Sequence, residues 1–187
     1  MASQLNGYAI VPHSTYDEFR QYLLTHGVNV DYTYGNQCWD SCALLWYQYG
    51  LTLQTGNGYA WGCWTFEADA NARPPFTKIT NLSQVKRGDV IVFNYNTSYY
   101  AGHIAFADED YQPGSSRISC VGQNQGQGVA SGTPSIVASM NALEFLGAFR
   151  NTNWTSPIPP TPPTPPTPQR EGRFPWVLYA RKLRQKR

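Results

Sequence analysis

The spacing of apolar residues changes along the chain, and its first part has the period of a helix. Apolar side chains recur every three to four residues between Tyr16 and Leu24. Ser14 or Thr15 can cap the start of this segment, acidic residues occupy its first turn, and Gly27 marks its end. The pattern predicts an amphipathic helix.

A second helix is predicted to begin near Gln37–Cys38 and to run to Gly50. One face of it is apolar and consists of Cys42, Leu45, Trp46 and Tyr49.

The pattern becomes strand-like from Lys86 onward. Segments 88–95, 102–109 and 116–124 predict strands, and 142–151 predicts a last strand or a short helix. Because helices come first and a run of strands follows, this order favours an α+β fold with an antiparallel sheet.

Composition narrows the class of protein. The chain of 187 residues suffices for one compact domain with additional segments. With 13 Tyr, 6 Trp and only 14% charged residues, it is too aromatic for a disordered chain and too polar for a membrane protein. The N-terminus lacks the basic and apolar regions of a secretory signal. We therefore expect another route of delivery if the substrate lies outside the membrane.

The C-terminal part differs in composition from the rest. Residues 155–169 are rich in Pro and Thr, which predicts an extended polyproline II spacer that reaches on the order of 40 Å. It separates a globular domain, residues 1–154, from a short tail, residues 170–187. Residues 1–169 carry seven basic and eleven acidic side chains, whereas the tail carries seven basic and one acidic. The two parts are electrostatically different.

Four cysteines are too few for a disulfide framework in a chain of this size, and none form a CxxC pair. Cys42, Cys63 and Cys120 are interpreted as small buried hydrophobes. Cys38 differs because it stands at the start of the second predicted helix. The helix dipole should lower the pKa of its thiol, and the free N–H groups there can hold an oxyanion.

His103 follows Gly102 at the start of a predicted strand, where it could act as the general base for Cys38. The alternative is a half-buried histidine satisfied by backbone groups. Asn124, at the end of the following strand, could orient the imidazole through its other nitrogen.

Four motifs in this order resemble the CHAP domain, the cysteine, histidine-dependent amidohydrolase/peptidase family of phage lysins and bacterial autolysins. They are residues 37–40 (QCWD), 88–93 (GDVIVF), 102–105 (GHIA) and 123–124 (QN). The resemblance covers roughly residues 14–151. It implies a papain-like α+β fold, with helices packed on an antiparallel sheet, that cleaves amide bonds of peptidoglycan.

The family pattern also assigns roles to residues. It makes Cys38 the nucleophile and His103 the base, and it gives Gln37 a part in shaping the oxyanion site. Many members carry a Glu that orients the histidine, but the matching position here is Gly122. The orienting role therefore falls on Asn124 or on an acidic residue elsewhere.

The segment before Cys38 places oxygen-bearing side chains at alternate positions, like the start of a calcium loop. A subset of CHAP lysins is similar. Carried over by position, that resemblance implies Ca²⁺ as a cofactor that supports the nucleophile's loop. The ligands would be the side chains of Asn29, Asp31 and Asp40 and the carbonyls of Thr33 and Gly35. The alternative is a polar loop in which Asp40 caps the helix.

Aromatic residues lie close to the motifs in sequence and could line a substrate groove. The candidates are Trp61, Trp64, Tyr99 and Tyr100, with Tyr59 nearby. For Trp61 and Trp64 a place in the core is an equal alternative.

The tail joins an aromatic–apolar patch to a run of cations. It could bind anionic wall polymers, a membrane surface or a phage particle, or it could be a solubilising segment only. No motif supports nucleic-acid binding.

Together these features indicate a peptidoglycan hydrolase, either an N-acetylmuramoyl-L-alanine amidase or an endopeptidase of the stem peptide or cross-bridge. We expect a phage lysin that resides in the host cytoplasm before release, or one that is part of a virion. One alternative is a non-catalytic wall-binding or tail-tip module that retains the fold. Another is a papain-like protease acting on ordinary proteins, which the lack of a recognisable signal or pro-segment disfavours.

Overall fold

The computed structural model describes residues 3–5, 8–10, 13–96, 100–126, 129–130 and 132–154. The predicted spacer and tail, residues 155–169 and 170–187, lie outside these residues and stay predictions.

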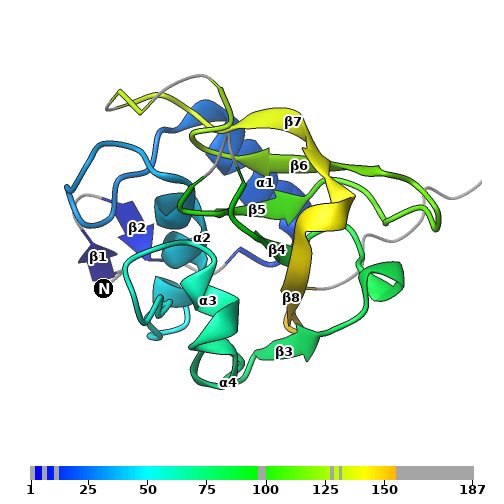
Figure 1. The fold of residues 1–187 in the computed structure, drawn as a ribbon. Coiled ribbons are helices and arrows are strands. Elements are labelled where there is room, and N and C mark those ends of the chain that lie inside the picture. Colours follow the sequence, from blue (N-terminus) through cyan, green and yellow to red (C-terminus); the bar gives the residue numbers. More distant parts are fainter. Residues whose placement is uncertain are drawn as a thin grey trace, which may run out of the picture. The chain divides into compact units, whose positions relative to one another are not determined.

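A six-stranded antiparallel sheet forms the centre of the described domain (Figure 1). Its strand order is β3-β8-β4-β5-β6-β7. The strands are β3 (Phe76–Ile79), β4 (Val90–Phe93), β5 (His103–Ala107), β6 (Arg117–Gly122), β7 (Ile136–Asn141) and β8 (Phe145–Asn151). A separate two-stranded hairpin, β1 (Ser3–Leu5) and β2 (Tyr8–Ile10), precedes the domain's first helix.

The helices come before the sheet in sequence. They are α1 (Tyr16–Thr25), α2 (Cys38–Tyr47) and two single-turn helices, α3 (Gly62–Thr65) and α4 (Ala68–Asn71). Short 3₁₀ turns, Leu82–Gln84 and Ala142–Glu144, precede β4 and β8. This arrangement confirms the predicted α+β class with an antiparallel sheet.

Local signals place α1 where it was predicted. Thr15 is its N-cap, and the hydroxyl oxygen of Thr15 accepts a hydrogen bond from the Glu18 N–H at 3.2 Å. The Glu18 carboxylate accepts a second one from the Ser14 N–H at 2.9 Å. Both proposed cap residues therefore contribute: Thr15 satisfies a free N–H group of the first turn, and Ser14 ties the preceding backbone to the helix.

Alternation along β4 and β5 divides the interior into two clusters. Val92 and Phe106 face the cluster that contains α1 and α2, whereas Ile91 and Ala105 belong to the cluster on the other side. Both strands are buried along their whole length. The sheet is therefore covered on both faces in its centre.

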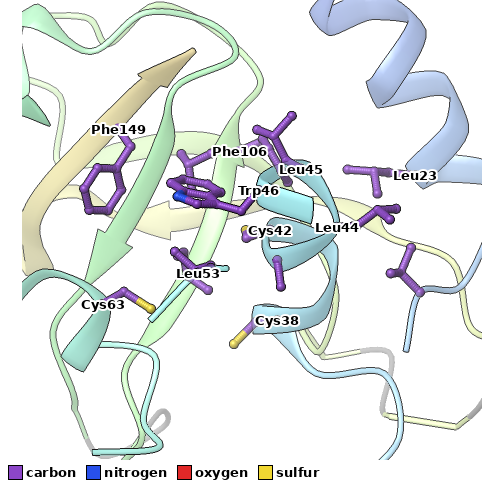
Figure 2. Packing of buried hydrophobic residues seen from close by; sticks show 14 of the residues in the cluster. Leu23, Cys38, Cys42, Leu44, Leu45, Trp46, Leu53, Cys63, Phe106 and Phe149 are labelled. Atoms are coloured by element: carbon purple, nitrogen blue, oxygen red, sulfur yellow. The ribbon is translucent and has the colours of Figure 1, made fainter. Parts of the chain in front are cut away.

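Aromatic and aliphatic side chains fill the cluster between α2 and the sheet (Figure 2). Trp46 of α2 stacks on Phe76 with ring centroids 3.9 Å apart, and it meets Phe149 edge-on at 5.6 Å. Its indole N–H donates to the Asn71 carbonyl oxygen at 3.0 Å. These contacts fix α2 against β3 and β8, and thereby fix the position of Cys38.

Cys42, Cys63 and Cys120 are fully buried and not disulfide-bonded, as predicted. No helix among the described residues is long and apolar enough to cross a membrane.

Candidate active site

Cys38 is the first residue of α2, and Gln37 is its N-cap. The thiol lies at the edge of the buried cluster and points away from the helix axis (Figure 2). Hydrogen bonding from the backbone of Ile104 to the sulfur lowers the pKa of Cys38, which places the thiol against the residue that follows His103. Packing of α2 on β5 thus places the Cys38 thiol against the strand that His103 begins.

The expected lowering of the Cys38 pKa is wrong as a net effect. Burial, the largest influence, raises it to about 11, and the charge of Asp40 adds to the increase. Backbone groups of Ile104 and Trp39 act in the opposite direction but do not prevail. The helix start favours the thiolate, but removing that charge from water costs more. Cys38 is therefore a neutral thiol at neutral pH.

His103 begins β5 and is only 1% exposed. Burial lowers the pKa of its imidazole to about 4, against a smaller opposing contribution from a hydrogen bond with Gln125. A neutral imidazole has one nitrogen that carries a proton and one with a free lone pair. The pair therefore consists of an uncharged thiol and an uncharged base.

Gln125 determines which nitrogen of His103 carries the proton. Its side-chain Nε2 faces the carbonyl oxygens of Ile136, Gly122 and Cys120, at 2.9, 3.3 and 3.4 Å. An amide nitrogen donates to such groups, so the Oε1 atom must be the one that lies 3.2 Å from His103 Nε2. His103 Nε2 then donates its proton to Gln125, and Nδ1 holds the lone pair.

Asn124 has a different contact from the one expected. Its Nδ2 donates to Gln37 Oε1 at 3.2 Å, and Gln37 Nε2 donates to the Tyr34 carbonyl oxygen at 2.6 Å. Asn124 therefore positions the residue before the nucleophile, and Gln125 is the amide that contacts His103.

Gln123 is a further residue that sequence reasoning missed as a site component. Its side-chain amide bonds both backbone groups of Val28, at 2.6 and 2.7 Å, and its Nε2 also donates to the Gln37 carbonyl oxygen at 3.1 Å. It thus joins the end of β6 to the segment that precedes α2. Gln123 stood in the fourth family motif, residues 123–124, but that motif assigned it no role.

Asp40 fulfils the capping role. Its two carboxylate oxygens accept from the Val30 and Gln37 N–H groups, each at 2.8 Å. Burial, together with the charge of Asp31, raises its pKa to about 7. The nearby charge implies that the two carboxylates lie close together.

The rest of the predicted calcium segment is a tightly bent loop. Asp31 Oδ1 accepts from the Thr33 N–H at 2.7 Å. Tyr32, Tyr34 and Gly35 have positive φ angles of 58°, 57° and 75°, which is uncommon for bulky residues. The donors offered by Asn29, Asp31, Thr33, Gly35 and Asp40 are all oxygens, which fits a hard cation. Among the described residues, no group of three or more His, Cys, Asp or Glu side chains is arranged for a metal ion.

The predicted groove aromatics separate into two environments. Trp64 packs on Phe149 with ring centroids 5.3 Å apart, and a Cβ atom at Gly147 would lie 2.1 Å from its ring. This favours the core alternative for Trp64. Trp61 lies among exposed rings. It contacts Tyr59, and Tyr59 in turn contacts Tyr100. Tyr99 lies outside the described residues.

Solved structures with a similar fold include an endolysin. The endolysin LysIME-EF1 superposes with a TM-score of 0.59 at 23% sequence identity, over 75% of this chain and 65% of that one. The structure of Ly7917 with the hydrolysing product of MDP gives a TM-score of 0.47 at 15% identity, over 74% and 63%. This chain thus spans somewhat less than two thirds of either protein. No curated protein matches the sequence.

The match to a family model is decisive. The CHAP domain model matches residues 27–124, which include Cys38, His103 and the loop between α1 and α2. The chain therefore belongs to the CHAP domain family.

Proposed function

We propose that the protein hydrolyses an amide bond of bacterial peptidoglycan, with Cys38 as nucleophile and His103 as base. The observation that supports this most is a helix-opening thiol that packs against β5, the strand that begins with His103. The tautomer of that imidazole is fixed by Gln125. The similarity to LysIME-EF1, an endolysin, agrees with this choice of substrate.

The first step forms a bond between the Cys38 sulfur and the carbonyl carbon of the substrate. His103 Nδ1 accepts the thiol proton as the sulfur attacks, because neither group is charged beforehand. The developing oxyanion is held by the free N–H groups at the start of α2 and by the Gln37 amide. Proton transfer requires the sulfur and Nδ1 to approach to about 3–3.5 Å in the substrate complex.

The following steps return the enzyme to its starting state. The tetrahedral intermediate collapses as the carbon–nitrogen bond breaks, and His103 gives its proton to the departing amine. The resulting thioester on Cys38 is attacked by water, which gives a proton to His103. The products are a carboxylate and an amine, and Cys38 recovers its proton.

Calcium is proposed as a supporting ion. Asn29, Asp31 and Asp40 would hold it with side-chain oxygens, and Thr33 and Gly35 with carbonyl oxygens. When bound, Ca²⁺ would compensate the two neighbouring carboxylates and stiffen the loop ahead of α2. Isothermal titration should then show binding that Asp31→Asn weakens. Chelation that leaves both the melting temperature and the wall-degrading activity unchanged would remove the ion from this account.

The direct test of function compares the protein with Cys38→Ser on purified Gram-positive cell walls. The parent should clear the walls, and the variant should not. Cys120→Ala is a matched control, since it alters a cysteine of the other core cluster. Equal clearing by parent and Cys38→Ser would contradict the proposed mechanism.

Mass spectrometry of the released fragments identifies the bond. New amino ends on L-Ala indicate an amidase, and cleaved stem peptides or cross-bridges indicate an endopeptidase. We also propose a phage lysin as the biological role, with the basic tail as a second attachment to wall polymers, membrane or phage particle.

A non-catalytic wall-binding module is the second candidate. It is favoured by the raised pKa of Cys38 and by Gly122 at the position where many family members carry Glu. Labelling with iodoacetamide separates the two. An active site should make Cys38 the fastest-reacting cysteine and should slow it when His103 is replaced, whereas uniform reactivity favours the binding module.

A further inference from the structure

Five aromatic side chains form a surface cluster beside the active site. Four of them are exposed, with Tyr100 at 79% and Phe66 at 58%. They come from two segments of the chain, 59–66 and 95–100, and Trp61 is the half-buried residue that joins them. We call this cluster the aromatic rim; it consists of Tyr59, Trp61, Phe66, Tyr95 and Tyr100.

Ring contacts show that the rim is continuous. The centroid of Trp61 lies 5.3 Å from that of Phe66, 6.1 Å from that of Tyr95 and 6.4 Å from that of Tyr59. Tyr59 meets Tyr100 edge-on at 6.3 Å. A connected group of exposed rings on a soluble domain commonly marks an interaction site.

The rim is built directly onto the strand that carries the base. The Trp61 N–H donates to the Ala101 carbonyl oxygen at 3.3 Å. Gly102 has a φ of +66°, and a Cβ atom there would lie 2.8 Å from the Trp61 Cβ and 2.7 Å from the Phe93 carbonyl oxygen. Only glycine allows this approach. Since Gly102 precedes His103, the rim is attached to the chain directly before the base.

The chemistry of the rim favours a neutral ligand with flat apolar faces. None of its five residues is charged. The polar groups next to it are amides, such as Asn57, whose Oδ1 accepts from the Tyr59 N–H. Two carboxylates lie near this region: Glu67 follows Phe66, and Glu144 accepts from Asn96. A carboxylate there repels the acidic groups of a stem peptide, whereas sugar rings pack their C–H faces on aromatic rings.

We propose that the aromatic rim binds the glycan strand of the wall polymer and holds it while an attached amide enters the active site. The proposal rests on the proposed function for its substrate, but it assigns a separate surface and one chemical part of that substrate. It implies that sugar binding and amide cleavage are separable.

The test measures binding with the full chain carrying Cys38→Ala, so that nothing is cleaved. The probes are a hexamer of β-1,4-linked N-acetylglucosamine and a sugar-free stem peptide, titrated by calorimetry. We expect the sugar to bind, and we expect Tyr100→Ala and Trp61→Ala to weaken it at least about tenfold. Val137→Ala, at a residue of β7 that is 46% exposed, is the control and should change nothing.

If Trp61→Ala unfolds, Tyr100→Ala keeps the test valid, because the Tyr100 side chain is largely exposed and its loss should not disturb the fold. In the background with Cys38 intact, it should leave the rate of Cys38 alkylation unchanged. Sugar affinity that is equal in the rim variants and the control overturns the proposal, as does rim-dependent binding of the stem peptide alone. A third outcome is that the sugar binds through the rim although the parent protein cleaves no wall. That outcome supports the proposed role of the rim and overturns only the proposed hydrolase function.

Discussion

The two ends of the β4–β5 strand pair differ in their electrostatics. At one end, Asp89 forms a two-point ion pair with Arg150 at 2.8 and 2.7 Å, and Asp108 forms another with Arg20 at 2.5 and 2.8 Å. At the other end, His103 contacts the neutral amide of Gln125.

This difference separates two kinds of family motif. The segment 88–93 contributes Asp89, whose ion pair with Arg150 joins β4 to β8. The segment 102–105 contributes His103, the proposed base. At the charged end each buried carboxylate is paired with an arginine. At the active site the Cys38 thiol and the His103 imidazole both stay neutral. Burial raises the pKa of the Cys38 thiol and lowers that of the His103 imidazole, so the two groups do not form an ion pair at neutral pH.

The largest expected effect comes from breaking the charged end. Asp89→Asn leaves Arg150 without its carboxylate, and because Asp89 is 2% exposed we expect a loss of about 2–4 kcal/mol in unfolding free energy. Urea denaturation measures it. Asp69→Asn is the control: its pair with Lys78 is exposed, so the change should stay below about 1 kcal/mol. If Asp89→Asn instead abolishes wall cleavage without loss of stability, the division between the two ends is wrong.

The neutral state of His103 should be detectable in the pH dependence of the unfolding free energy. The pKa of His103 falls from 6.5 to about 4 on folding. Its contribution is therefore fully present above pH 6.5 and is lost as the pH falls toward 4. The parent should lose on the order of 2–3 kcal/mol more than His103→Gln between about pH 7 and pH 4.5.

This pH effect has to be read as a difference between the two proteins. The pKa of Asp40 rises to about 7 and changes stability in the opposite sense, but it does so equally in parent and variant. Identical pH curves for the two proteins would show that burial does not hold His103 neutral.

A smaller effect follows from loosening the contact of His103. Gln125→Leu removes the acceptor for His103 Nε2, and we expect kcat to fall roughly 10–100-fold with little change in KM. Gln125→Glu should raise the pKa of His103, so that the acid limb of the pH–rate profile moves to higher pH. Gln112→Leu, an exposed glutamine, serves as control. A parent-like kcat in Gln125→Leu would exclude a positioning role.

Much of the fold followed from local patterns. The first helix was predictable from its cap residue Thr15 and the helical spacing after it. The strands around Val92 and Phe106 were predictable from their continuous apolar runs. The strands β3 and β7 were missed. β7 is an edge strand with exposed Ile136 and Val137, so it lacks an alternating pattern. β3 buries only its first and last residues, which is not an alternating pattern either.

The site was predictable in its nucleophile and base but not in their environment. Cys38 and His103 stand in recognisable motifs. Gln125 does not, because its place depends on Asn124 adopting a φ of +54°, a local turn that the sequence does not specify. The raised pKa of Cys38 results from burial by side chains distant in sequence, whereas only the helix start is visible locally.

The rate of Cys38 alkylation as a function of pH tests the central claim, a neutral thiol–imidazole pair, most directly. Peptide mapping by mass spectrometry follows Cys38 alone. With a pKa of about 11, the rate should rise steadily from neutral to alkaline pH, without a plateau below pH 9. A fast rate that is constant from about pH 5 to pH 8 would reveal a preformed thiolate–imidazolium pair and contradict this account.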